Sequence, residues 1–183
     1  MKESFSSYIN LLDSWMKYFG FEVFGGFSEV SIGFNFDRMY HKKATEITRF
    51  GNVDTYAIVK AIEDNITAET FKSFSEQAFD YASKIRKGGP LGLGSMLVVF
   101  PLVVLEKIPQ DVYTFLKSYC PKHWASVEFP CILDLETSNL YYYEQTPMWG
   151  RFIIPLTEKK LTGSSLQTHG KVYRKQAINN LTL

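Results

Sequence analysis

Residues 53–86 read VDTYAIVKAIEDNITAETFKSFSEQAFDYASKIR, which predicts a buried strand followed by an amphipathic helix. Apolar and β-branched side chains dominate residues 54–62, so this segment is expected to be a central strand carrying Lys60. Thr67 can cap a helix over residues 68–86, and Glu69 suits the positive start of that helix. The apolar face of the helix consists of Phe71, Phe74, Ala78, Tyr81, Ala82 and Ile85.

The residues just before this strand predict a hairpin. Gly51 and Asn52 both tolerate positive φ, so they suit a two-residue turn. Such a turn places Arg49 opposite Asp54, and Lys43 opposite Lys60. In this register Asp54 is expected to be a surface partner of Arg49 beside the turn.

The N-terminal part predicts a helix and two strands. Apolar residues recur at three- and four-residue steps from Phe5 to Phe19, with Ser4 suited to the helix start and Gly20 to its end. A strand over residues 21–24 and a half-buried, alternating strand over residues 30–34 are expected to follow.

The C-terminal part contains one sequence pattern twice. Residues 98–105 (VVFPLVVL) and residues 127–134 (VEFPCILD) share one pattern, and a short helix over residues 109–119 is expected between them. Two strands joined by a helix are expected to be parallel, with irregular pairing at each proline. A last strand over residues 140–144 completes an α/β fold, borderline with α+β. The expected fold is a single mixed sheet flanked by helices in the order αβββαβαββ.

Composition is that of an ordinary globular domain. The chain has 183 residues and a formal net charge of +1, so its overall charge does not indicate a nucleic-acid or membrane partner. We expect one α/β domain over residues 1–155 and a basic, partly ordered tail over residues 156–183. The two cysteines have no metal or redox spacing and the N-terminus has no signal-peptide core, so a cytoplasmic location is expected. Glycines and prolines interrupt the uncharged run 88–105, which predicts a loop and a strand rather than a membrane span.

The predicted order resembles the restriction-endonuclease-like superfamily, the PD-(D/E)XK nucleases, whose core is helix, three strands, helix, strand. SWMKYFGFEVF (residues 14–24) looks like the opening helix and first strand of that core. VDTYAIVKAIEDNITAETFKSFSEQAFDYA (residues 53–82) looks like its third strand and following helix. The resemblance covers about residues 4–105. It implies that Lys60 is the lysine that orients the attacking water, and that Gln77 is a helix glutamine facing the active site.

The same resemblance implies a Mg²⁺ site formed by an Asp and a Glu, with the Glu two residues before the lysine. Ile58 occupies that position. Asp54 shares a face with Lys60 and is the candidate replacement, although six strand residues separate the two by roughly 20 Å. The other acids that a neighbouring strand could bring to Lys60 are Asp37, Glu29 and Glu22. The candidate catalytic residues are therefore Asp54, Lys60 and Gln77, and the metal ligands stay open.

A second group of candidates is aromatic. Tyr141, Tyr143, Trp149 and Arg151 are candidates for binding nucleic acid or a protein partner, because exposed aromatic side chains stack on bases or form interfaces. A homodimer interface is an equally good interpretation. The three histidines have no metal-ligand spacing, and His123 is expected to satisfy local backbone in a loop.

Two functions follow from these residues. The favoured one is a nuclease-like domain that has lost cleavage, needs no cofactor and binds nucleic acid or protein. The alternative is an active, Mg²⁺-dependent nuclease with a migrated carboxylate. Whether the chain is an enzyme stays open, and the missing acid at Ile58 favours the first function.

Overall fold

The computed structural model describes residues 2–29, 33–46, 51–63 and 65–143. The chain divides into two compact units, Met1–Thr146 and Pro147–Leu183. The second unit lies outside the described residues. The domain boundary expected near residue 155 and the basic tail 156–183 therefore lie outside them as well.

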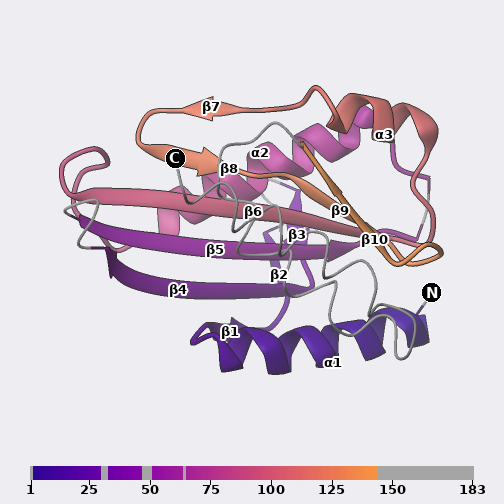
Figure 1. Ribbon diagram of the computed structural model, residues 1–183, viewed down its shortest axis with the longest axis horizontal. Coiled ribbons are helices and arrows are strands. Elements are labelled where there is room, and N and C mark those ends of the chain that lie inside the picture. Colours follow the sequence, from indigo (N-terminus) through magenta and orange to yellow (C-terminus); the bar gives the residue numbers. More distant parts are fainter. Residues whose placement is uncertain (1, 30–32, 47–50, 64, 144–183) are drawn as a thin grey trace, which may run out of the picture. The chain divides into compact units, whose positions relative to one another are not determined.

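The described chain is a mixed α/β fold in which a large mixed sheet is flanked by three helices (Figure 1), as the sequence predicts. The helices are α1 (Lys2–Tyr18), α2 (Ala68–Ile85) and α3 (Gln110–Leu116). The strands are β1 (Glu22–Phe24), β2 (Phe27–Glu29), β3 (Phe34–Phe36), β4 (Arg38–Glu46), β5 (Gly51–Ala61), β6 (Ser95–Leu105), β7 (Lys122–His123), β8 (Ser126–Glu128), β9 (Cys131–Asp134) and β10 (Asn139–Tyr142).

The sheet is antiparallel on one side and parallel on the other. β4 pairs antiparallel with β1 and β5, whereas β6 is parallel to β5, β8 and β9. β7 and β10 pair antiparallel with β8 and β9, and β2 and β3 form a separate two-stranded ribbon. The predicted parallel unit around α3 is confirmed. Phe129 and Pro130 separate β8 from β9, where proline predicts irregular pairing.

The register of the β4–β5 hairpin differs from the predicted one. Lys43 pairs with Asp54 rather than with Lys60, and Glu46 pairs with Gly51. The shift covers an even number of residues, so side chains keep their faces of the sheet. Asp54 and Lys60 share a face in either register, because an even number of residues separates them on β5. What differs from the prediction is the residue of β4 that each of them faces.

The predicted Gly51-Asn52 turn is wrong, because both residues belong to β5. Residues 47–50, including Arg49, lie outside the described residues. Gly51 has a different structural role. A Cβ on Gly51 would lie 2.5 Å from the carbonyl oxygen of Gly94, so glycine permits a close approach of two backbones.

Helix α2 begins as its sequence predicts. The Thr67 hydroxyl accepts a hydrogen bond from Thr70 N at 3.2 Å, and Thr67 N donates to Thr70 Oγ1 at 2.9 Å. These two bonds satisfy backbone and side-chain groups at the helix start reciprocally. The helix ends at Ile85, and Arg86 follows as its C-cap residue.

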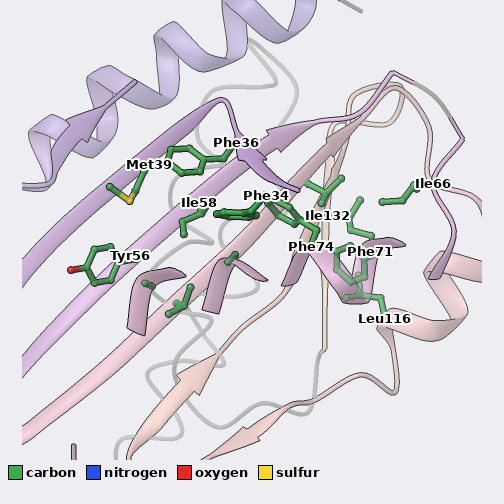
Figure 2. Close-up of a cluster of buried hydrophobic side chains, with 14 of the residues drawn as sticks. Phe34, Phe36, Met39, Tyr56, Ile58, Ile66, Phe71, Phe74, Leu116 and Ile132 are labelled. Carbon is green, nitrogen blue, oxygen red and sulfur yellow. The ribbon is translucent and has the colours of Figure 1, made fainter. Parts of the chain in front are cut away.

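The two faces of the sheet are covered by different helices, with α2 on one face and α1 on the other (Figure 1). Tyr56 and Ile58 of β5 point toward α2, where they join a buried cluster with Phe71 (Figure 2). Tyr40 of β4 belongs to the opposite face, and its hydroxyl donates to Asp13 of α1 at 2.7 Å. Each fully buried Ile or Phe contributes about 1.5–3 kcal/mol, so this core holds β5 at the centre of the fold.

No helix in the described part of the chain is both long enough and apolar enough to cross a membrane. The apolar segment that contains Pro101 forms the buried strand β6.

Candidate functional site

Lys60 is half-buried near the C-terminal end of β5, a central strand as predicted. Ile58, two residues earlier, is fully buried against α2. The acid Asp37 lies at the same end of β5, where its Oδ2 accepts a hydrogen bond from Ala61 N, the residue after Lys60, at 2.8 Å. Among the described residues, no carboxylate forms an ion pair with Lys60. A catalytic role of Lys60 therefore stays a prediction.

The two other candidate catalytic residues lie apart from Lys60 or bond elsewhere. Asp54 and Lys60 occupy the same face of β5, but the extended strand separates them by roughly 20 Å. Gln77 is half-buried on α2, where its amide donates to Ser73 Oγ at 2.8 Å. Asp54 and Lys60 cannot act on one small group, and Gln77 hydrogen-bonds within its own helix.

Asp54 belongs instead to a buried polar cluster. Its side chain is only 2% exposed, with Oδ1 3.2 Å from His41 Nε2 and Oδ2 3.8 Å from the Arg86 guanidinium. Arg86 also donates to Ser95 Oγ at 2.7 Å, and His41 stacks on Tyr56 with ring centroids 4.4 Å apart. Within the described part of the chain, Asp54 Oδ2 has no hydrogen-bond partner.

The true register of the hairpin explains how this cluster forms. His41 pairs with Tyr56 and Lys43 pairs with Asp54, so His41 and Asp54 are diagonal neighbours on the face that α2 covers. Burial, with a smaller effect of the Asp54 charge, raises the pKa of Tyr56 to about 12. Sequence reasoning missed His41 because the predicted register placed Asp54 beside the turn. The correct strand pairing is the signal that identifies it.

A second polar cluster lies where β7 and β8 meet α2. The Glu128 side chain is 1% exposed, and His123 Nε2 lies 2.6 Å from its Oε2. Its Oε1 accepts hydrogen bonds from Ser75 Oγ at 2.5 Å and from the Tyr119 hydroxyl at 3.5 Å. The His123 ring stacks on Phe79, with centroids 3.7 Å apart.

Two properties of this cluster matter chemically. The sequence predicts that His123 serves loop backbone, but in the structure it belongs to β7 and pairs with a buried carboxylate. Burial, followed by the Glu128 charge, raises the pKa of Tyr119, so the hydroxyl stays protonated and donates to Glu128. The cluster thus holds one imidazole and one carboxylate in fixed orientations.

A pocket of about 320 Å³ opens beside the second cluster, lined by residues 119–123, residues 126–130 and Tyr143. Apolar groups make up most of the wall, among them Pro121 and Val127. The free thiol of Cys120 also lines the pocket. This pocket therefore combines an apolar wall with an oriented imidazole.

The tyrosines at the C-terminal end of the described chain, two of which are candidates, divide between two faces. Tyr141 packs edge-on against Tyr113 of α3, with centroids 5.2 Å apart, and adjoins the core beneath α2. Tyr142 packs on Phe129, which belongs to the other face. Tyr143 lines the pocket, whereas Trp149 and Arg151 lie outside the described residues. Tyr141 therefore packs inside the fold. Whether the four predicted residues form one surface stays a prediction, because two of them lie outside the described residues.

A different aromatic surface lies at the end of α1. We call Trp15, Tyr18 and Phe19 the α1 patch. The Trp15 and Phe19 rings stack with centroids 5.9 Å apart, and Tyr18 meets Phe19 edge-on at 5.3 Å. Tyr18 is 80% exposed and Phe19 is 39% exposed. Lys17 lies in the last turn of α1, and Lys42 Nζ donates to the Phe19 carbonyl at 2.8 Å.

Within the residues that the structure describes, no group of three His, Cys, Asp or Glu side chains is arranged to hold a metal ion. Comparisons with protein-family models, with curated proteins and with solved structures found no match to this chain.

Proposed function

We propose that this chain is a divergent restriction-endonuclease-like domain that binds single-stranded nucleic acid without cleaving it. The observation that carries the loss of cleavage is Ile58, which is fully buried two residues before Lys60, where the superfamily's motif requires an acid. A hard carboxylate oxygen is needed there to hold Mg²⁺ beside the lysine. An isoleucine side chain supplies none.

The order of the main elements supports the superfamily assignment. We set aside the β2–β3 ribbon and the short β7, and count β8 and β9 as one interrupted strand. The remaining order is then α1, β1, β4, β5, α2, β6, α3, β9, β10. We take this reduced succession of helix, three strands, helix, strand, helix and strands as support for the proposal.

The α1 patch supports binding of single-stranded nucleic acid. Unpaired bases stack on exposed aromatic rings, and each stacked base contributes about 1–3 kcal/mol. Tyr18 is the most exposed ring of the patch and Phe19 adjoins it at 5.3 Å, so one or two bases can lie against these rings. A duplex would not expose its base faces to them.

Two lysines beside the patch suit a phosphate backbone. Lys17 precedes Tyr18 in the last turn of α1. Lys42 reaches the same place from β4, with its Nζ against the Phe19 carbonyl and 5.6 Å from the centroid of the Phe21 ring. Cations next to stacking rings favour a polyanion over an apolar protein surface.

One observation favours the alternative, an active nuclease with a migrated carboxylate. Asp54 Oδ2 is buried and, among the described residues, has no hydrogen-bond partner, as a metal ligand would be before its ion binds. The surrounding donor set does not fit Mg²⁺, however. The Arg86 guanidinium lies 3.8 Å from that oxygen, so its positive charge would repel the ion. We therefore rank this alternative second.

A cleavage assay separates the two functions. Plasmid DNA and fluorescent single-stranded DNA are incubated with the full chain and Mg²⁺ or Mn²⁺, alongside Lys60→Ala and Asp54→Asn. We expect binding by the wild type and no cleavage by any of the three proteins. Cleavage that disappears in either variant would establish the nuclease and overturn the proposal.

The same material tests the class of partner. Single-stranded DNA should bind in a salt-dependent manner and more tightly than duplex. Concentration-dependent self-association without DNA binding, measured by sedimentation, would instead favour a protein interface. Trp124, which is 83% exposed, offers a matched aromatic control: Trp124→Ala should bind DNA as the wild type does.

A further inference from the structure

The pocket beside His123 and Glu128 has no role in the proposed nucleic-acid binding. We propose that it is a proton-abstraction site: it binds a small uncharged molecule with an apolar, unsaturated body, and His123 Nδ1 removes an acidic proton from that molecule. Glu128 acts as the positioning residue. This inference is independent of the proposed nucleic-acid function.

The orientation of His123 is fixed from two sides. Its Nε2 lies 2.6 Å from Glu128 Oε2, and its ring lies flat on Phe79, with centroids 3.7 Å apart and an interplanar angle of 12°. A charge-assisted contact and a stacked ring together restrict both rotation and tilt of the imidazole. A fixed base is more effective than a free one because its orientation entropy is already lost.

The same contact determines which ring nitrogen can take a proton. In the proposed site Nε2 donates to the Glu128 carboxylate, which only accepts hydrogen bonds when ionised, and Nδ1 is the nitrogen that takes the substrate proton. No described residue forms a hydrogen bond with Nδ1.

Glu128 is itself held in place, so it can orient His123 without rearrangement. Ser75 Oγ and the Tyr119 hydroxyl both donate to Oε1, which leaves Oε2 to His123. The Glu128 side chain is 1% exposed and the His123 side chain 30% exposed, so water reaches the imidazole but not the carboxylate. This arrangement is that of a base with its orienting carboxylate.

The pocket selects the class of substrate. Its volume of about 320 Å³ and its mostly apolar wall suit a one- or two-ring molecule without charge. Cys120 lines the same pocket, but its thiol forms no hydrogen bond with His123 among the described contacts. The geometry thus places the base function on the imidazole and gives no activated thiol.

A simple eliminating compound reports this chemistry without any co-reactant. In 5-nitrobenzisoxazole, Nδ1 takes the ring C–H proton, the C–H electrons complete a nitrile, the N–O bond breaks, and oxygen leaves as the phenolate. The imidazolium then returns its proton to buffer. The coloured phenolate allows kcat and KM to be measured at about pH 8.

We expect saturable elimination by the wild type. His123→Gln should lower kcat/KM about 100-fold, because a positioned general base contributes at least about that factor to the rate. Cys120→Ser should keep the wild-type rate, and so should His41→Gln, which alters a histidine paired with a different buried carboxylate. A wild-type rate no higher than that of free imidazole overturns the proposal. A rate that survives His123→Gln, or that is lost in Cys120→Ser, overturns it as well.

A second measurement begins with the wild type, so its first result does not depend on how a variant folds. The ¹⁵N spectrum of wild-type histidine side chains should show His123 as the Nε2–H tautomer, and an Nδ1–H tautomer overturns the assignment. In Glu128→Gln the amide can donate to Nε2, which should switch His123 to the Nδ1–H tautomer and lower kcat with little change in KM. A purely structural Glu128 would leave the tautomer unchanged.

Discussion

A carboxylate as buried as that of Asp54 needs partners, because an uncompensated charge in a protein interior costs several kcal/mol. His41 and Arg86 supply them, at 3.2 Å and 3.8 Å. The Arg86 side chain is itself only 10% exposed, so the two charges depend on each other. Their mutual dependence gives this cluster a structural role that can be measured.

Asp54→Ala should lower the free energy of unfolding by about 3–5 kcal/mol, because it leaves the Arg86 charge buried without its carboxylate. Urea denaturation at pH 7 measures the change. Asp80→Ala removes an exposed acid from α2 and should alter stability by no more than about 0.5 kcal/mol. A loss below about 1 kcal/mol for Asp54→Ala would contradict this account of the cluster.

The raised pKa of Tyr56 should make the protein less stable at high pH. Burial, with a smaller effect of Asp54, raises its pKa to about 12, above the value of about 10 in an unfolded chain. The folded state then holds a proton that the unfolded state has released, so the contribution is complete below about pH 10 and is lost as pH rises toward 12. Between those values the stability of wild type should fall more steeply than that of Tyr56→Phe. Parallel curves for the two proteins would show that the Tyr56 pKa is not raised.

At the level of elements, the close approach of two strands at their starts depends on Gly51. Gly51→Ala should destabilise the protein by about 1–3 kcal/mol, because a Cβ there would lie 2.5 Å from the Gly94 oxygen. Gly89 is the matched control, since a Cβ on it meets nothing within 4 Å. Thermal unfolding of the two alanine variants should separate them clearly. Equal midpoints would mean that the backbones are not in contact.

Asp134 links the end of β9 to the loop before α3 and to the turn before β10. Its Oδ2 accepts from Ile108 N at 2.9 Å, and its Oδ1 accepts from Thr137 N at 2.8 Å and Thr137 Oγ1 at 2.9 Å. Burial alone would raise the pKa of this carboxyl, but these hydrogen bonds hold it below its usual value. The carboxylate therefore stabilises the fold only while it is ionised.

The consequence is an acid-dependent contribution to stability. A lowered pKa gives stability that is present above about pH 4, the ordinary aspartate value, and is lost as pH falls through the folded-state pKa. Asp134→Asn should be less stable than wild type by about 1–2 kcal/mol at pH 7, with the difference shrinking below pH 4. Glu136→Gln, which changes a 54%-exposed acid nearby, should show no such pH-dependent difference. A difference that stays constant down to pH 2 would contradict the assignment.

The elements that could be predicted are those whose own sequence determines them. Helix α2 has both its capping threonine and its apolar face within the segment, and the parallel unit around α3 repeats one apolar pattern. The β4–β5 register could not be predicted, because Gly51-Asn52 has turn chemistry but serves a close backbone contact with Gly94. The alternating strand predicted over residues 30–34 is not confirmed, because β3 begins only at Phe34 and residues 30–32 lie outside the described part of the chain. The strands β2 and β7 are three and two residues long, too short for alternation to reveal.

For the whole molecule, the two buried polar clusters could not be predicted from the sequence either, because their members come together only in the folded chain. His41, Asp54 and Arg86 come from β4, β5 and the end of α2, so only the three-dimensional pairing brings them together. His123 and Glu128 are five residues apart, yet their contact depends on a turn in which Ala125 adopts a positive φ of 49°. Alanine gives no sequence signal for that conformation. The absence of an acid at Ile58, by contrast, is readable directly from the strand.

Fluorescence anisotropy with a labelled oligothymidine, measured over a range of salt concentrations, tests whether single-stranded DNA binds at the α1 patch. Tyr18→Ala should weaken binding about tenfold, equivalent to about 1.4 kcal/mol of lost stacking. Lys42→Gln should reduce the slope of log K against log salt by about 0.7, one phosphate contact on a single strand, whereas Lys107→Gln should not change it. No binding by the wild type, or equal affinities for wild type, Tyr18→Ala and Lys42→Gln at every salt concentration, would contradict the account.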